Sequence, residues 1–386
     1  MKSDPRAFFI LIALIGGLAI FSSTLSKTPV LPLFALSLHA SPAEIGWIVM
    51  ASTLPGVLIS YPAGVWSDRL GKRRLLLASL MVFATAPFLY LLISNAWQLL
   101  AVRFYHGFAT AIFGTVAIAA IAERYTADRA TRLSTYSSVT IVGRSIAPFL
   151  GGFLISLASF NAVYLACAIS GVLALMAGLL LRDDAPAATV KQERPPFWAS
   201  LTTVLRDRRI MLVSLIEAAQ YLVFGAIEAF LALFAASVGI PAWQIGIILG
   251  VQLVSIVFAK PLMGRLSDRV GRRQVILPGL LVGASSVALL PLAPSFIGLS
   301  ALSLVFGIGF ATVTSSTTAL VADLTRNGRY GASMGVLRTV MDVGQSIGPV
   351  LTGWMVGMAG YGSAFTLLAA ILVCAALLLG LVFKEA

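Results

Sequence analysis

Long apolar runs recur along the whole chain and constrain it more than any other feature. Residues 8–21, 75–93 and 367–382 are examples. A bilayer core of ~30 Å is crossed by a helix of ~20 apolar residues, and only helices and closed barrels satisfy their own backbone hydrogen bonds in lipid. Strands of a membrane barrel alternate apolar and polar residues over ~10 positions, and these runs do not alternate. The sequence therefore predicts an integral membrane protein built from helices.

The charged residues support a membrane location. Only 11% of the 386 residues are charged, whereas a soluble protein has about a quarter. A net charge of +12 could indicate a nucleic-acid partner, but no RNA-binding motif accompanies it. We therefore expect the lipid bilayer as the partner and no nucleic acid.

The basic residues lie in alternate loops. Lys and Arg are concentrated at 67–74, 123–132, 182–209, 265–273 and 324–330, whereas the loops near 38–43, 94–96, 158–161, 238–241, 294–295 and 359–361 contain neither. Cytoplasmic loops carry such an excess of basic residues. This pattern predicts that both termini are cytoplasmic, in a protein of the bacterial inner (plasma) membrane.

The apolar runs predict twelve transmembrane helices. Their ranges are 8–36, 44–66, 75–93, 97–122, 132–157, 162–181, 210–237, 242–264, 274–293, 296–322, 331–358 and 362–383. We expect an N-terminal six-helix bundle over 1–182, a cytoplasmic linker over 183–209 and a C-terminal six-helix bundle over 210–386. The end of the linker has its apolar residues on one helical face, which predicts either a helix lying on the membrane surface or a helix packed on the protein.

An internal repeat at an offset of about 200 residues relates the two halves. Residues 64–74 return as 264–274, residues 107–110 as 309–312, residues 122–123 as 322–323, and residues 145–148 as 346–349. Four matches in the same order are hard to attribute to chance. Six helices per repeat give both repeats the same orientation, so the halves are related by an axis along the membrane normal. The expected fold is all-α, with two pseudo-symmetric bundles in what we expect to be a monomer.

The repeated loop resembles the signature of the major facilitator superfamily, Gly-x-x-x-Asp-Arg-x-Gly-Arg-Arg, between helices 2 and 3. The matching residues are Gly64, Asp68, Arg69, Gly71 and Arg73, and in the second copy Gly264, Asp268, Arg269, Gly271 and Arg273. The resemblance covers essentially the full chain and implies alternating access, with this loop holding the cytoplasmic side closed. Each Asp could accept hydrogen bonds from a helix N-terminus or pair with Arg73 or Arg273. The alternative is that these charges only set the topology.

Two further segments strengthen the resemblance. Leu99-x-x-x-Arg103-x-x-His106-Gly107 is similar to the helix-4 motif, with His where Gln is commoner. A Pro-Gly pattern in helix 5 resembles a motif of proton-coupled antiporters, with Ala147 in place of a glycine, and it recurs in helix 11. Its residues are Gly143, Pro148, Gly151, Gly152, Gly344, Gly348, Pro349 and Gly353. The motif also occurs in other efflux proteins, and each proline could simply bend its helix.

Ionisable residues inside the predicted spans are the best candidates for a substrate or proton site, since each is costly in lipid and usually faces a cavity or a partner. With neighbouring polar residues they are Lys27, Arg103, His106, Arg144, Glu217, Gln220, Tyr221, Glu228, Arg338 and Asp342. Glu217, Gln220 and Tyr221 share a helical face, and Arg338 and Asp342 can pair at i,i+4. We expect Lys260 to extend toward the membrane surface. Static salt bridges are the alternative to a transport role.

The leading functional hypothesis is a secondary active transporter that exports a small molecule in exchange for protons. Glu217 is the expected proton carrier, because desolvation favours the protonated form of a carboxyl group. Helix 1 has no acidic residue, where many drug antiporters of the resembling family carry one. The alternatives are a transporter of an anionic metabolite, with Lys27, Arg103 and Arg144 as ligands, and a non-transporting receptor.

The sequence predicts no enzyme, metal or cofactor. It contains no nucleophile–base motif, metal-ligand spacing or nucleotide-binding loop. Cys167 and Cys374 lie in apolar helices and are expected to be small buried hydrophobic residues.

Overall fold

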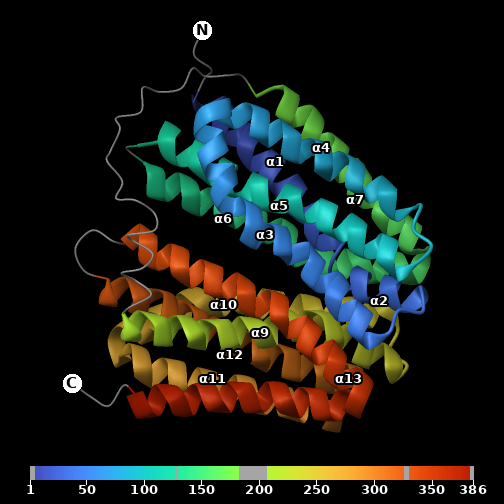
Figure 1. Ribbon diagram of the computed structural model, residues 1–386, viewed down its shortest axis with the longest axis vertical. Coiled ribbons are helices and arrows are strands. Elements are labelled where there is room, and N and C mark those ends of the chain that lie inside the picture. Colours follow the sequence, from blue (N-terminus) through green and yellow to red (C-terminus); the bar gives the residue numbers. More distant parts are fainter. Residues whose placement is uncertain (1–4, 127, 182–206, 326–329, 383–386) are drawn as a thin grey trace. The chain divides into compact units, whose positions relative to one another are not determined.

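The computed structural model describes residues 5–126, 128–181, 207–325 and 330–382, and all regular structure within them is helical (Figure 1). The chain divides into two compact units. Unit 1 comprises 1–40, 47–191 and 241–246, and unit 2 comprises 41–46, 192–240 and 247–386. The proposed linker over 183–209, with its surface helix, falls almost entirely outside the described residues, so the domain boundaries stay a prediction.

The helices of the first half are α1 (Pro5–Leu25), α2 (Val30–Ser37), α3 (Pro42–Leu70), α4 (Lys72–Tyr90), α5 (Ala96–Arg124), α6 (Arg129–Leu157) and α7 (Phe160–Leu179). Those of the second half are α9 (Arg208–Ser237), α10 (Ala242–Val270), α11 (Arg272–Leu289), the short 3₁₀ helix η1 (Leu290–Leu292), α12 (Phe296–Leu324) and α13 (Tyr330–Val382).

Eleven stretches of the described residues are long and apolar enough to cross a membrane. The last, Ser333–Leu381, has 49 residues, or ~73 Å at 1.5 Å per residue, which is more than twice the bilayer core. Gly360 interrupts it with φ 79° and ψ 175°. The stretch therefore provides two crossings, and the fold has the twelve transmembrane helices in two six-helix bundles that the sequence predicts.

The expected helix over 8–36 is wrong as a single element. Residues 26–29 form a turn between α1 and α2. Pro29 has no N–H to donate and disfavours helical backbone at the residue before it, so the hydrogen-bonding pattern is interrupted there although the apolar stretch Arg6–Ser37 continues as one span.

Equivalent helices have equivalent neighbours in the two units. In unit 1, α1 packs on α6, and α4 packs on α5 and α7 (Figure 1). In unit 2, α9 packs on α13, and α11 packs on α12 and α13. Gly344 in the first part of α13 faces α9, and Leu372 in its second part faces α11. The internal repeat of the sequence is thus also a repeat of helix packing.

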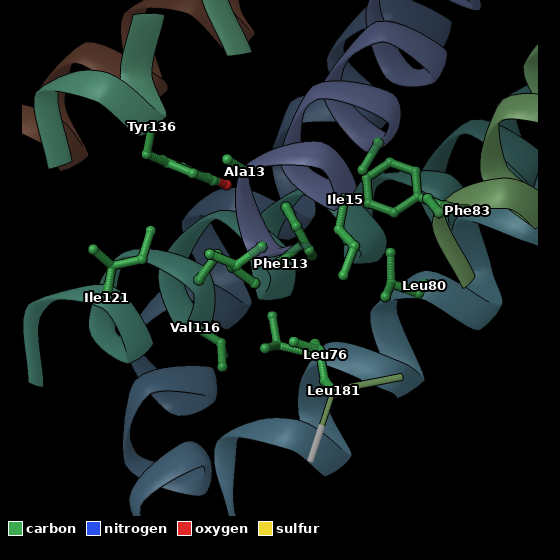
Figure 2. Packing of buried hydrophobic residues seen from close by; sticks show 14 of the residues in the cluster. Ala13, Ile15, Leu76, Leu80, Phe83, Phe113, Val116, Ile121, Tyr136 and Leu181 are labelled. Carbon is green, nitrogen blue, oxygen red and sulfur yellow. The ribbon is translucent and has the colours of Figure 1, made fainter. Parts of the chain in front are cut away.

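A hydrophobic cluster holds unit 1 together at the level where α1, α4 and α5 meet. Ile15, Leu80, Phe83 and Phe113 are fully buried in it, and Tyr136 of α6 extends toward Ala13 (Figure 2). Burial of such side chains is worth about 1.5–3 kcal/mol each relative to exposure in water, and inside a membrane close packing supplies the attraction.

Two glycines make the tight connections that the repeated loop requires. Gly71 has φ 91° and directly precedes α4, and Gly271 has φ 112° and directly precedes α11. L-residues with a Cβ rarely adopt such angles. A single glycine therefore lets consecutive long helices reverse direction at both copies of the motif.

Candidate functional site

A buried carboxyl group lies in the middle of unit 2. Glu217 is on α9, nine residues after the helix begins, and its side chain is 2% exposed. Its Oε2 accepts a hydrogen bond from the hydroxyl of Thr317 on α12. That hydroxyl also lies 2.9 Å from the carbonyl oxygen of Val313, one turn earlier in α12.

Lys260 of α10 is the basic residue of this cluster. Its charge acts on Glu217, and its Nζ lies 5.9 Å from the ring centroid of Phe310 on α12. Lys260 is half-buried beside this ring, and the expectation that it extends toward the membrane surface stays a prediction. We call Glu217, Thr317, Lys260 and Phe310 the Glu217 cluster.

The residues that share the helical face of Glu217 lie in different surroundings. The ring of Tyr221 packs edge-on against Phe310, with centroids 5.0 Å apart. Gln220 is fully buried, and neither atom of its amide has a hydrogen-bond partner among the described residues. Glu228, three turns along α9, is only half-buried. The face is thus mixed, with one part packed in the bundle and another more accessible.

A second polar cluster lies in unit 1. Arg103 of α5 is 4% exposed and donates from one terminal nitrogen to the Tyr90 hydroxyl at 3.0 Å and to the Ser26 hydroxyl at 3.3 Å. The Tyr90 oxygen also lies 3.2 Å from Nδ1 of His106. Tyr90 stacks on Tyr164 of α7, with ring centroids 4.3 Å apart. We call these five residues the Arg103 cluster.

The remaining candidates are placed individually. Lys27 lies in the turn between α1 and α2 and not within a helix. Arg144 is exposed on α6, inside the apolar stretch Thr131–Leu157. Arg338 is exposed and Asp342 half-buried on α13, and within the described part of the chain no ion pair joins them. The i,i+4 pair that their spacing allows is therefore not formed in this structure.

The repeated loop makes matching contacts in both units. Lys72 pairs with Glu123 at 2.6 Å, and Arg272 pairs with Asp323 at 2.9 Å. Arg272 also pairs with Asp268. The pairing of Asp268 with Arg273 that the sequence allows is not found among the described residues, because Arg272, directly after the turn at Gly271, takes that position.

The following arginine of each loop binds backbone carbonyls. Arg73 donates to the carbonyl of Leu181, and Arg273 donates to that of Gly380 at 3.0 Å. Carbonyls at a helix C-terminus lack intrahelical partners, which explains why a guanidinium is used there. The side chain of Asp68 lies outside what the structure describes, and Arg69 and Arg269 are exposed.

The Pro-Gly motifs bring helix backbones together. Pro148 and Pro349 lie inside α6 and α13. A Cβ on Gly143 would lie 3.0 Å from the carbonyl oxygen of Gly17 on α1, and one on Gly344 or Gly348 would overlap carbonyls of α9. Gly151 and Gly152 face α2 and the start of α10, and Gly353 faces the start of α3. Glycine permits these close contacts in a membrane interior.

Several contributors to these clusters were missed from the sequence. Thr317, Tyr90, Ser26 and Tyr164 are uncharged and carry no spacing signal in a chain rich in such residues. The acidic partners of the repeated loop, Glu123 and Asp323, could have been found from the sequence, because they belong to one of the four repeated matches. Cys167 is buried as expected, but Cys374 is exposed.

The similarity of this chain to known proteins agrees with these features. A family model described as the Major Facilitator Superfamily matches residues 12–244 and 213–386. An uncharacterised transporter of that type from Methanocaldococcus jannaschii is 25% identical over 87% of this chain and 88% of its own length. Multidrug resistance protein 1 of Bacillus subtilis is 24% identical over 85% of this chain and 84% of its own.

Solved structures support the fold. The nucleoside transporter NupG aligns with a TM-score of 0.87 at 15% identity over 98% of this chain and 100% of its own. A bacterial homologue of the lysosomal transporter Spinster aligns with a TM-score of 0.79 at 18% identity over 98% and 96%. With the family match along both halves and the repeated loop, these similarities show that the chain is a transporter, a multi-pass membrane protein belonging to the major facilitator superfamily.

Proposed function

We propose that this transporter exports a small molecule in exchange for protons, and that Glu217 carries the proton. The observation that carries the proposal is the burial of this carboxyl group in an apolar bundle, with a hydroxyl as its hydrogen-bond partner. An ionisable group at such a depth is costly unless it serves function or a partner. Relatives named as multidrug resistance proteins favour efflux over uptake.

Thr317 suits a group that gains and loses a proton. When Glu217 is ionised, the hydroxyl of Thr317 can donate to the carboxylate. When Glu217 is protonated, the carboxyl can donate to the Thr317 oxygen, and the hydroxyl proton can turn to the carbonyl of Val313, which lies 2.9 Å away. A hydroxyl is both donor and acceptor, so one side chain serves both protonation states.

Lys260 offsets only part of the cost of the ionised state, because burial of the carboxyl group outweighs the lysine charge. Its positive charge acts on Glu217 across the bundle, and attraction between opposite charges is stronger away from water. A lysine that also rests on the Phe310 ring retains a favourable contact when the carboxyl is neutral. Lys260 therefore has a favourable contact in both protonation states of Glu217.

The test is transport by Glu217→Gln in proteoliposomes. The amide keeps the shape of the side chain but cannot exchange a proton, so accumulation driven by a pH gradient should fall at least tenfold. Energy-independent substrate exchange should partly survive. The fluorescent cations commonly exported by multidrug transporters serve as first substrates.

A matched variant separates this role from a structural one. Glu228→Gln makes the same chemical change on the same helix at a half-buried position, and it should retain gradient-driven transport. If Glu217→Gln accumulates substrate like the wild type, Glu217 is not the proton carrier. If it loses thermal stability and exchange together, the carboxyl is a structural partner of Thr317 and Lys260.

A second candidate is transport of an anionic metabolite. Arg144 favours it, because this cation is exposed on α6 within an apolar stretch and no carboxylate among the described residues pairs with it. A guanidinium there could bind a carboxylate or phosphate. Binding of anionic and cationic substrates to wild type and Arg144→Gln, measured by calorimetry, distinguishes the two candidates.

A further inference from the structure

The Arg103 cluster contains a buried positive charge without a negative one. The acceptors of the Arg103 guanidinium are the hydroxyls of Tyr90 and Ser26 and the carbonyl oxygen of Ser26, at 3.0, 3.3 and 3.5 Å. No carboxylate among the described residues forms an ion pair with it. Arginine does not lose its proton in proteins, so the charge persists.

The cluster also has more donors than acceptors. Tyr90 accepts from Arg103, and we assign its own proton to the hydrogen bond with Nδ1 of His106. Neutral His106 then carries its proton on Nε2, and this nitrogen is buried without a partner. The Nε of Arg103 and the hydroxyl of Tyr164 are also buried without partners among the described residues. The unmatched groups are thus two N–H donors and a hydroxyl that can donate.

A bound anion both compensates the buried positive charge and accepts hydrogen bonds from the unmatched donors. An isolated buried charge costs several kcal/mol even after relaxation, and each unmatched buried donor costs about 1–3 kcal/mol. Water could accept from the donors, but it would leave the charge uncompensated. We propose that the Arg103 cluster binds a small monovalent anion, such as chloride or the carboxylate of a small acid.

Aromatic rings limit the size of the occupant. Tyr90 and Tyr164 are stacked in near-parallel contact, and Phe83 lies edge-on to His106 with centroids 5.6 Å apart. Cys167, beside Tyr164 on α7, is fully buried. These rings and the buried thiol surround the unmatched donors, so the proposal is restricted to an ion of a few atoms. All of these residues belong to unit 1, and the inference does not depend on the role of Glu217.

The test measures thermal unfolding of the purified transporter at constant ionic strength. Gluconate, a bulky organic anion, is replaced stepwise by chloride, bromide or formate. A ligand that binds the folded state raises the Tm with its concentration. We expect a saturable rise with the small anions, and anomalous scattering from bromide beside Arg103 in crystals.

Variants assign the effect to this cluster. Arg103→Gln should abolish the anion dependence, and Tyr164→Phe, which removes only a hydroxyl, should weaken the apparent affinity roughly tenfold. Arg129→Gln removes an exposed arginine at the start of α6 and should leave the dependence unchanged. If Arg103→Gln does not fold, Tyr164→Phe and the bromide experiment still test whether an anion binds at this cluster.

The comparison of the salts identifies the kind of anion that binds. A rise with chloride and bromide indicates a free halide, whereas a rise with formate alone indicates a carboxylate-bearing compound. A Tm that is the same in all four salts, or a rise that persists in Arg103→Gln, would overturn the proposal. Absence of a bromide peak beside Arg103, together with a Tm that does not rise in formate, would leave water as the occupant and would also overturn it.

Discussion

At the scale of single residues, a hydroxyl and a carboxyl group carry most of the functional argument. Thr317 bonds both to Glu217 and to a carbonyl of its own helix, so the direction in which its hydroxyl donates follows the protonation state of Glu217. Its neighbours Ser316 and Thr318 have similar side chains, yet no interaction with Glu217 is found for either.

Thr317→Val tests this arrangement. Valine keeps the β-branched shape but has no hydroxyl, so Glu217 loses a partner in both protonation states. We expect gradient-driven transport to fall about tenfold, which corresponds to ~1.4 kcal/mol, with a smaller effect on energy-independent exchange. Thr317→Ser retains the hydroxyl and is expected to transport nearly like the wild type. Equal transport by the valine and serine variants would show that the hydroxyl is dispensable.

At the scale of helices, close backbone contacts join α13 to α9. A Cβ on Gly348 would overlap the carbonyl oxygen of Leu222, and one on Gly344 would overlap that of Ala218. The glycines of the Pro-Gly motif therefore set the separation of these helices. This packing is sufficient to explain the second copy of the motif, and a role in coupling stays a prediction.

Gly348→Ala should force the helices apart and lower the free energy of unfolding by about 1–3 kcal/mol. Gly357→Ala is the matched control, because it adds the same methyl group to the same helix at a position with nothing within 4 Å. Thermal unfolding of both variants in detergent provides the comparison. A Gly348→Ala protein as stable as Gly357→Ala would show that the helices separate without cost.

The sequence predicts helices better than contacts. Apolar length and the 200-residue repeat predict the spans, but they do not predict the turn at residues 26–29, where Pro29 divides the first span into two helices. The repeat also points to Glu123 and Asp323, because the loop and its partners recur together. It does not identify Lys260 as a member of the Glu217 cluster, since that placement depends on the rotation of α10 about its own axis, which the sequence does not give.

At the scale of the whole molecule, twelve crossings place both termini on the same side of the membrane. The basic loops predict that this side is the cytoplasm. Cysteines introduced at exposed positions in loops and at helix ends of a cysteine-free protein test the orientation. We expect Arg129→Cys and Asp207→Cys to react with an impermeant reagent only in inside-out vesicles, and Ser94→Cys only in right-side-out vesicles. Reaction of Arg129→Cys and Asp207→Cys from opposite sides would contradict the predicted topology.

The glycine break inside α13 also affects how this part of the chain is made. The two crossings on either side of Gly360 are joined without a polar loop. During biosynthesis, a segment that reaches the far side of the membrane must carry its polar groups across the lipid, and this turn offers few of them. The crossings before and after Gly360 can therefore enter the bilayer together as a helical hairpin.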